Sequence, residues 1–478
     1  MIDSGATLAR RLERYRAATG TANAPGTGPP VVAGGTELAE RLAAAIDGEV
    51  VVTAEGTIVR CEPPTRLIPV DRERLAPLPG QPEPDVPLVC LDTETTGLAT
   101  AAGTVAFLIG LGWWEAERFR QVQLVLPDHA EERALLTALA SAIPAAAWLV
   151  TYNGRGFDWP LLVARYRLAR RPAPVHAGHL DLLPIVRRLF RHRMPDARLR
   201  TAEAELLGLH RIGDVDGGEI PGRYFDYLRG GPAEGLVDVI RHNDQDVRSL
   251  ARLLGHLETR LGDRECRAVA PTGDLAGLAR AFARERRLGE ALECLDVATT
   301  RSLDGSRAAP QSRPQSRADT VARPIGPRIP LGVRPDDDPW WSPRRPADFG
   351  GPPGRAIQGV TPSRTAQLDA PWTAERIAAD RAHLLRRLGR YVEAVEAWDA
   401  LTAGPGRMAI VAMIEQAKLH EHRLRDRPAA LAATVRGLGH VERRRQLGRP
   451  EPALEANLRR RMARLRRHHG KTDRRSVA

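Results

Sequence analysis

Three strand-like apolar runs follow one another between residues 86 and 128, separated only by short connections. They read VPLVCLDTE, GTVAFLIGLGWWE and RFRQVQLVLPD, and the third has apolar side chains at every second position. Short connections between consecutive strands favour antiparallel pairing, because a parallel pair needs a crossover of a dozen or more residues. The order therefore predicts an antiparallel meander.

A helix, another strand and a second helix are predicted directly after the meander. HAEERALLTALASAI has acidic residues in its first turn, where the helix dipole favours negative charge, and RGFDWPLLVARYRLAR reads as the second helix. Between them, AAAWLVTYNG reads as a fourth strand, of parallel type. This order describes the core of a ribonuclease H-like fold. We therefore expect an α/β domain, with a mixed sheet and flanking helices, over residues 86–262.

Composition divides the rest of the chain into segments of different character. Residues 1–85 combine a stretch rich in Gly, Pro and Thr with one predicted helix, TELAERLAAAI, and a strand pair around EVVVTAEGTIVRC. They are expected to be a partly disordered N-terminal extension. Residues 303–371 are rich in Pro, Arg, Ser and Gly, which is typical of a linker or disordered insertion. There, Trp340 and Trp341 belong to a loop or, alternatively, to a docking motif.

Three alanine-rich segments of the C-terminal half resemble one another: RRLGEALECLDVA, RRLGRYVEAVEAWDAL and RLRDRPAALAATVRGL. Each follows an amphipathic helix and has a turn marked by Gly or Asp. Small residues let paired helices pack closely, as in tetratricopeptide-like (TPR-like) units. We expect an α-helical repeat region with such units over residues 273–300 and 372–440. It would bind a protein partner or buttress the α/β domain.

The net charge of +12 is concentrated at the C-terminal end of the chain. From Arg436 onward there are fourteen Arg or Lys residues and only four acidic ones, and residues 441–478 read as a basic tail. Such a cluster can neutralise the phosphates of a nucleic acid. The chain has only two lysines, however, so the arginine excess also fits a coding bias. Both interpretations stay open at this point.

The sequence also bears on the compartment of the protein. No apolar run reaches the roughly 18 residues that a membrane span needs, and the first residues lack the apolar core of a signal peptide. The four cysteines stand far apart without a CxxC pair, which argues against a zinc site or a disulfide framework. We therefore expect a cytoplasmic protein without a membrane partner.

The run VCLDTETTGL places two acidic residues at the end of the first strand. Because strand side chains alternate between faces, Asp92 and Glu94 project from the same side. Like charges this close are favourable mainly when a cation lies between them, and oxygen-only ligands suit Mg²⁺ or Mn²⁺. The alternative is a strand end with two solvated acids, so the metal interpretation requires carboxylates from elsewhere.

Further carboxylates occur in two downstream motifs. TYNGRGFDWPLL places Asp158 near the start of a helix, with Asn153 at the end of the preceding strand. GLVDVIRHNDQDVRSLARLLGHL reads as a long helix on which His242 and Asp246, four residues apart, share one face. A two-metal nuclease needs such a set: four acids hold two divalent ions ~3.5–4 Å apart, and a base activates the attacking water.

Two other acids in this region are expected to have different roles. Asp181 precedes LLPIVRRLF and is expected to cap that helix, with a place beside the metal site as the alternative. Asp244 lies roughly 200° round the helix from Asp246, so it is expected to be solvated.

Taken together, LDTETTGL, GTVAFLIGLGWW, YNGRGFDWPLL, HLDLLPIVRRLF and HNDQDVRSL resemble the motifs of the DEDD 3′-5′ exonuclease superfamily of DnaQ-like proteins. More narrowly, the chain is similar to YprB-type ribonuclease H-like proteins, which carry TPR-like repeats after the nuclease domain. The resemblance covers roughly residues 86–256, and the repeats more loosely. It implies a nuclease that hydrolyses phosphodiester bonds at single-stranded DNA or RNA ends and releases nucleoside monophosphates.

The resemblance also implies a set of metal ligands and a set of substrate contacts. Two divalent ions, Mg²⁺ or Mn²⁺, would stabilise the entering and leaving oxygens of an in-line attack. The expected metal ligands, which also count as catalytic, are Asp92, Glu94, Asp158 and Asp246. The expected substrate-binding residues are Thr96, Gly97, Leu98 and Asn153.

One residue departs from the superfamily pattern. That pattern has either a tyrosine four residues before the last aspartate or a histidine five residues before it, whereas His242 stands at the tyrosine spacing. A histidine within reach of the attacking water is still suitable as a base, so His242 completes the expected catalytic set. The alternative function is a non-catalytic nucleic-acid-binding or scaffold protein with the same fold and repeats.

Overall fold

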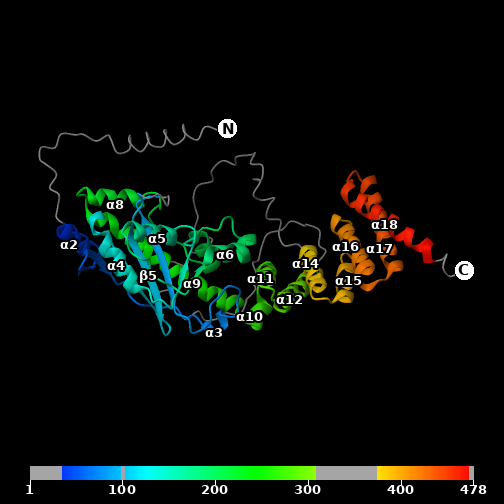
Figure 1. Cartoon of the computed structure of the whole chain (residues 1–478), viewed down its shortest axis with the longest axis horizontal. Coiled ribbons are helices and arrows are strands. Elements are labelled where there is room, and N and C mark those ends of the chain that lie inside the picture. Colours follow the sequence, from blue (N-terminus) through cyan, green and yellow to red (C-terminus); the bar gives the residue numbers. More distant parts are fainter. Residues whose placement is uncertain (1–34, 98–102, 308–373, 473–478) are drawn as a thin grey trace, which may run out of the picture.

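The computed structural model of the chain describes residues 35–97, 103–307 and 374–472 (Figure 1). An α/β domain lies at one end of an elongated molecule, and a series of helices extends from it to the other end. Several expectations concern residues outside the described ranges. These are the substrate contact of Leu98, the role of Trp340 and Trp341, and the character of residues 1–34 and of most of the 303–371 segment.

The central sheet contains the predicted meander. Strands β4 (Leu88–Thr95), β5 (Ala106–Glu115) and β6 (Arg118–Val125) pair antiparallel in sequence order. Strand β7 (Trp148–Thr151) pairs with β4 in parallel, as predicted. A further parallel strand, β8 (Gly178–Asp181), borders β7 and was not predicted, because its four residues GHLD show no apolar alternation. The mixed sheet with flanking helices is confirmed.

Residues that precede β4 extend the same sheet. Strands β1 (Glu49–Thr53) and β2 (Gly56–Cys61) form the predicted pair, and β2 continues onto β6. The short strand β3 (Arg66–Leu67) also pairs with β6. The described residues thus form an eight-stranded sheet, in which seven strands follow the order β1-β2-β6-β5-β4-β7-β8 and β3 pairs with β6 beside this path. The predicted helix is α2 (Gly35–Ile46), which packs on β2. From residue 35 onward, the N-terminal segment is structurally part of the α/β domain.

Helices cover both faces of the sheet. Helix α9 (Val237–Leu261) packs on β4, β5 and β6 from one side. Cys90 faces this side and Leu91 faces the other, where it joins a second apolar core, as strand alternation requires. The helices that contribute to this second core include α2, α4 (Glu132–Ala142), α5 (Asp158–Leu168) and α8 (Ile220–Leu228). The remaining helical segments of the domain are α3 (Arg72–Leu75), η1 (His129–Glu131), α6 (Leu182–Phe190), η2 (Arg191–Arg193), α7 (Leu199–Ala202), η3 (Glu203–Leu207) and η4 (Ala233–Leu236).

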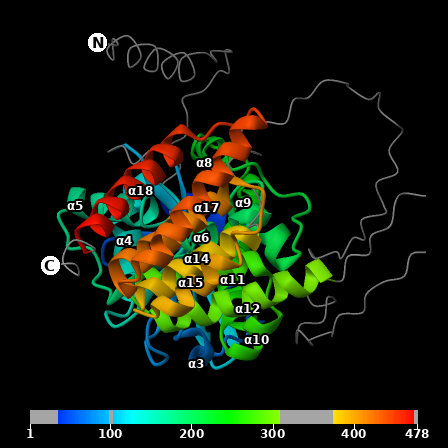
Figure 2. The same cartoon turned by 90° about the vertical axis from the view of Figure 1, so that its right-hand side faces the viewer.

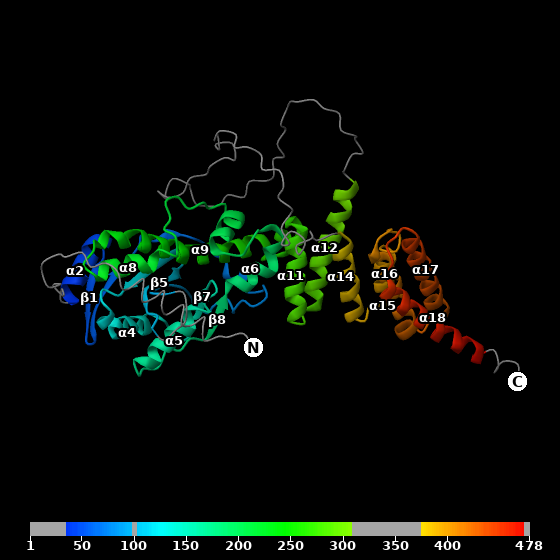
Figure 3. The ribbon, with the colours of Figure 1, turned by 90° about the horizontal axis from the view of Figure 1, so that it is seen from above.

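The C-terminal helices stack in sequence order (Figures 2 and 3). From α11 onward, each helix that the structure describes packs on the next one. Residues 441–478 were expected to be a basic tail; instead, α17 continues to Gln446 and most of the remainder forms α18. Every helix within the described ranges is too short or too polar to span a lipid bilayer. The bounds are α10 (Arg264–Val269), α11 (Thr272–Arg284), α12 (Leu288–Arg307), α14 (Ala374–Arg387), α15 (Tyr391–Asp399), α16 (Arg407–Leu419), η6 (His420–Leu424), α17 (Arg427–Gln446) and α18 (Pro452–Thr472).

The helical series is joined to the α/β domain where α11 packs on α6. Gly277 permits this contact, because a Cβ there would lie 2.6 Å from the carbonyl oxygen of Arg188. Nearby, the carboxylate of Asp274 is only 1% exposed, accepts a hydrogen bond from Arg193 at 2.9 Å and lies 3.2 Å from His192 Nε2. One apolar core runs without interruption from the sheet through α6, α11, α12, α14 and α15.

Candidate active site

The candidate site lies where the end of β4 faces helix α9. Asp92 and Glu94 point toward α9, and Asp92 Oδ2 accepts a hydrogen bond from Asn243 Nδ2 at 2.9 Å. Gly110 on β5 makes this approach possible, because a Cβ there would lie 2.2 Å from Asn243 Oδ1. Gly110, the first glycine of the GLGWW motif, therefore allows α9 to pack close enough for its polar residues to contact the carboxylates of β4.

Asn243 fixes the position of α9 on the sheet. It is fully buried, and its Oδ1 accepts a hydrogen bond from Gln123 Nε2 at 2.9 Å. A Gln123–Asn243–Asp92 chain thus links β6, α9 and β4, and the hydrophobic pattern of α9 gave no sign of it. The prediction that Asp244 is solvated is wrong: its side chain is 16% exposed and forms an ion pair with Arg248 one turn further along.

Asp158 reaches the site from the opposite side of the sheet. It is the first residue of α5, and its Oδ1 accepts a hydrogen bond from Thr93 Oγ1 at 2.5 Å. The turn before α5 places Asn153 at a positive φ of 71°, a conformation that asparagine tolerates better than most residues. The backbone N–H of Asn153 donates to Asp181 Oδ1 at 2.8 Å. The same oxygen caps α6 by accepting from Leu183 N at 3.0 Å, which confirms the predicted cap.

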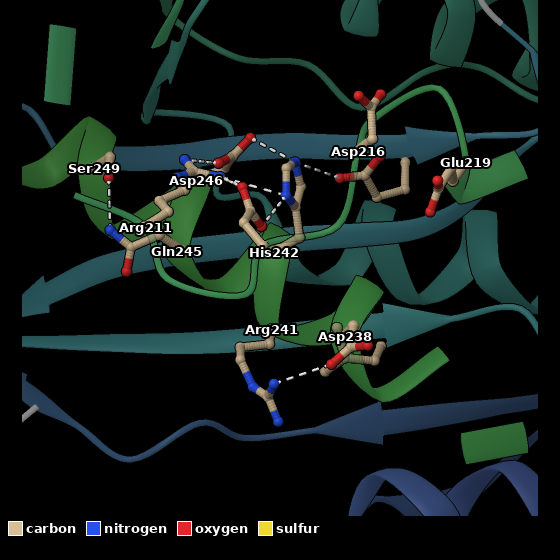
Figure 4. A network of polar contacts seen from close by, with 12 residues as sticks. Arg211, Asp216, Glu219, Asp238, Arg241, His242, Gln245, Asp246 and Ser249 are labelled. Carbon is tan, nitrogen blue, oxygen red and sulfur yellow. Dashed lines mark hydrogen bonds and ion pairs between the residues drawn. The ribbon is translucent and has the colours of Figure 1, made fainter. Parts of the chain in front are cut away.

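His242 and Asp246 stand one turn apart on α9, on the face that meets β4, as their spacing predicted. His242 Nε2 lies 3.7 Å from Asp246 Oδ2 and 3.9 Å from Glu94 Oε1. Asp246 Oδ1 accepts a hydrogen bond from Arg211. Figure 4 shows Arg211 and Asp246 beside His242. The structure thus brings together the five residues expected to be catalytic.

Three charged residues of this network were not identified in the sequence. Arg211 lies in the loop between η3 and α8 and also pairs with Glu203 and Asp214. Asp214 Oδ1 lies 2.7 Å from His242 Nδ1. Glu203 is fully buried and accepts a hydrogen bond from Ser249 on α9. Arg211 and Asp214 lie in a loop without periodicity, and Glu203 begins the short segment η3; neither stretch carries a motif that would have marked these residues.

The electrostatics of the site reflect an excess of acid. Burial raises the pKa of Asp92 well above its ordinary value, and the carboxylates of Asp246, Glu94 and Asp158 raise it further. Burial also raises the pKa of Glu94 to about 8, against the lowering effect of His242, and it raises the pKa of Asp158. Burial alone would lower the pKa of His242, but Asp214, Asp246 and Glu94 raise it to about 9. These carboxylates therefore destabilise one another in their charged forms.

The chemistry of this donor set fits divalent cations. Glu94, Asp158 and Asp246 lie close enough to Asp92 to raise its pKa, and the four carboxylates together offer the oxygen ligands that Mg²⁺ or Mn²⁺ prefers. Among the described residues, no three His, Cys, Asp or Glu side chains are placed so that they could hold one metal ion together. One oxygen of Asp246 is bonded to Arg211 instead. The residues that would hold the ions are Asp92, Glu94, Asp158 and Asp246.

Of the expected substrate-contact residues, Thr96 and Gly97 directly follow β4, and Asn153 lies in the turn before α5. The backbone N–H of Thr96 donates to Val105 O at 2.9 Å, and its hydroxyl accepts from Val105 N at 3.0 Å, so these groups hold the strand end. The carbonyl of Gly97 accepts a hydrogen bond from Thr95 Oγ1 at 2.7 Å. Asn153 is exposed beside the turn that precedes Asp158.

Residues 89–258 match the family model described as RNase_H superfamily. Over 224 residues the chain is 34% identical to a protein of Bacillus subtilis (strain 168) named "Uncharacterized protein YprB". That match covers 46% of the chain and 54% of the Bacillus protein, so the chain spans about half the length of this relative.

One similar solved structure is the family B DNA polymerase from the hyperthermophilic archaeon Pyrobaculum calidifontis. The match covers 79% of this chain and 49% of the polymerase, with 15% identity and a TM-score of 0.30, a similarity too low to establish a shared fold. The family match and the mixed sheet agree over the same part of the chain. Residues 89–258 form a ribonuclease H-like domain.

Proposed function

We propose that this protein is a metal-dependent nuclease of the DEDD type, a 3′-5′ exonuclease that acts on single-stranded DNA or RNA ends. The observation that carries the proposal is the convergence of Asp92, Glu94, Asp158 and Asp246 at one end of β4. Structural ion pairs balance charge, whereas this set holds more acid than neighbouring cations can neutralise. Such an arrangement is favourable mainly in a protein that binds divalent ions there.

The four carboxylates would hold two Mg²⁺ or Mn²⁺ ions, which supply charge stabilisation for the entering and leaving oxygens. His242 has the position of a general base, since its Nε2 faces Glu94 and Asp246. The positive charge of bound ions would lower the pKa of His242 from about 9, and the neutral Nε2 would then accept a proton from the attacking water while the water oxygen bonds to phosphorus. The bond from phosphorus to the 3′ oxygen breaks, that oxygen takes up a proton from solvent, and a nucleoside 5′-monophosphate leaves.

The resemblance to YprB-type proteins supports a further part of the proposal, a TPR-like array that binds a protein partner. Helices α11 and α12, α14 and α15, and α16 and α17 form successive packed pairs. Val392 on α15 and Val435 on α17 are 60% and 48% exposed.

Purified full-length protein tests the nuclease proposal with single strands of DNA and RNA, each labelled at the 5′ or the 3′ end. With Mn²⁺ or Mg²⁺ we expect progressive shortening of 5′-labelled strands and early release of the label as a mononucleotide from 3′-labelled strands. EDTA and an Asp92→Asn variant should each stop the reaction. Binding of the strands without hydrolysis, with the parent and the variant alike, would instead support a non-catalytic binding protein.

A further inference from the structure

The loop that carries Arg211 and Asp214 contacts two residues of the proposed site. Asp214 is bonded to His242, and Arg211 is bonded to Asp246. We propose that Asp214 is a positioning residue that directs Nε2 of His242 into the carboxylate site. The inference rests on the proposed nuclease function, and it adds to that function an Asp–His pair in which only the histidine contacts the reacting groups.

The two nitrogens of the His242 ring have different surroundings. Nδ1 lies 2.7 Å from Asp214 Oδ1, whereas Nε2 is directed to Asp246 and Glu94. A carboxylate accepts a hydrogen bond and cannot donate one when ionised, so Nδ1 carries the proton. Arg211 Nη1 is 3.4 Å from the same nitrogen, too far to compete with the shorter contact. In the neutral ring, Nε2 is then the unprotonated nitrogen and is able to accept a proton.

Asp214 is itself held in place. Its Oδ2 lies 3.2 Å from Arg211 Nη1, and the side chains of Asp214 and Arg211 are 9% and 7% exposed. Arg211 is anchored by two hydrogen bonds to Glu203, each of 2.6 Å. Glu203 is bonded in turn to Ser249 on α9. These contacts form a series that runs from Ser249 through Glu203, Arg211 and Asp214 to His242. Ser249 and His242 both lie on α9, so the helix that carries the imidazole also anchors the residues that hold it.

The pairing also matches the charge that would develop during hydrolysis. When Nε2 takes a proton, the ring becomes an imidazolium, and the Asp214 carboxylate at Nδ1 stabilises that charge. Burial would raise the pKa of Asp214, but His242 and Arg211 hold it below its ordinary value, so the carboxylate stays ionised beside the ring. If the Asp214–His242 pair had only a structural role, it would stabilise the fold whichever way Nε2 pointed.

Proton NMR of the metal-free full-length protein, labelled with ¹⁵N-histidine, tests the contact without any reliance on activity. We expect a downfield Nδ1–H resonance in the parent that disappears in His242→Ala and in Asp214→Asn. Asp216→Asn is the matched control, because Asp216 is exposed in the same loop and bonds to Gly218 N. That variant should keep the resonance. A resonance that persists in Asp214→Asn, or one that is missing from the parent, would overturn the proposal.

Kinetics on end-labelled strands at saturating Mn²⁺ test the positioning role. Asp214→Asn should lower kcat by roughly 10–100-fold with little change in KM, a range typical of residues that orient a catalytic group. The double variant Asp214→Asn/His242→Ala should be no slower than His242→Ala, because Asp214 acts only through the imidazole. Equal losses in both backgrounds, or an unchanged kcat, would refute the positioning role. Failure of the parent to hydrolyse any strand would refute the nuclease function, and the resonance would still decide the Asp–His contact.

Discussion

Two of the regions that bury carboxylates in this molecule treat the charge in opposite ways. At the junction of α6 and α11, Asp274 has Arg193 and His192 as neighbours, so one acid faces two basic side chains. At the end of β4, Asp92, Glu94, Asp158 and Asp246 share a small volume, and Arg211 bonds to just one of these four carboxylates, that of Asp246. The junction uses charge to join two parts of the fold, whereas the β4 site keeps an excess that favours a cation from outside.

The balanced charges at the junction contribute to stability, whereas the excess of acid at the β4 site costs stability and suits a functional site. A balanced buried pair resists disruption, since removal of one partner leaves the other charge buried and unpaired. An unbalanced acidic cluster raises its own pKa values, so loss of one member relieves repulsion in the folded state. Substitutions in the two regions should therefore have opposite effects on folding and on hydrolysis.

The largest effect is expected from Asp92→Asn. Hydrolysis should fall by roughly 10³-fold or more, about 4 kcal/mol in the barrier, because one of the four carboxylates that would hold the ions is lost. The metal-free variant should unfold at the same temperature as the parent or at a higher one, because one of four repelling charges is gone. Single-turnover rates with Mn²⁺ and thermal melts in EDTA measure both. Retained metal-dependent cleavage would end the two-metal assignment.

Asp274→Ala should give the reverse result. The free energy of unfolding should fall by about 3 kcal/mol, the lower end of the range for a broken buried pair, because Arg193 is 33% exposed and partly solvated. Hydrolysis per folded molecule should be unchanged. Urea unfolding at pH 7 and active-site-normalised rates check the two parts. A large loss of activity in fully folded Asp274→Ala protein would show that the junction also serves the site.

Addition of metal should stabilise the β4 site and leave the junction unaffected. At 100 times its dissociation constant, Mn²⁺ should raise the free energy of unfolding by about 2.7 kcal/mol if it binds only the folded state. The gain should persist in Asp274→Ala and disappear in Asp92→Asn. Melting temperatures over a Mn²⁺ titration, with Ca²⁺ and NaCl at equal ionic strength as controls, measure the effect. Equal gains in parent and Asp92→Asn would place the ion elsewhere.

Local periodicity accounts for what could be predicted from the sequence. Strand alternation placed Asp92 and Glu94 on one face, and helix spacing placed His242 and Asp246 on one face, before any tertiary contact was known. The order of strands and helices was enough to predict the meander and the parallel strand β7. These features depend only on residues a few positions apart, so a local pattern carries them.

The supporting residues of the site could not be predicted in this way. Arg211 is 35 positions from Asp246, Asp214 is 28 from His242, and Glu203 is 46 from Ser249. No local pattern encodes such contacts, because they arise only when the loop folds back onto α9. The position of β1 and β2 in the sheet could not be predicted either. The sequence indicated that the two strands pair with each other, but it did not indicate that β2 pairs with β6.

The smallest effect concerns His256, a half-buried residue near the junction whose ring nitrogen Nε2 is shielded from solvent. It lies on α9 against Phe190 of α6, with ring centroids 5.6 Å apart, and its Nε2 has no hydrogen-bond partner among the described residues. Burial, and to a smaller extent Arg260 and Arg193, lower its pKa from the ordinary 6.5 to about 3. Between these values the unfolded chain binds a proton that the folded protein does not, so stability falls as the pH is lowered from 6.5.

Each pH unit within that window corresponds to about 1.4 kcal/mol, so the step from pH 6.5 to 5 should remove about 2 kcal/mol through His256 alone. His256→Phe keeps an aromatic ring on Phe190 and should lose less stability than the parent by that amount. The raised pKa of Glu94 acts in the opposite direction over the same range and is common to both proteins, so their difference isolates His256. Urea unfolding at pH 6.5 and pH 5, with the exposed His210→Gln as control, measures it. Parallel losses in parent and His256→Phe would mean that the buried ring accepts a proton without penalty, and that the junction tolerates unbalanced charge as the β4 site does.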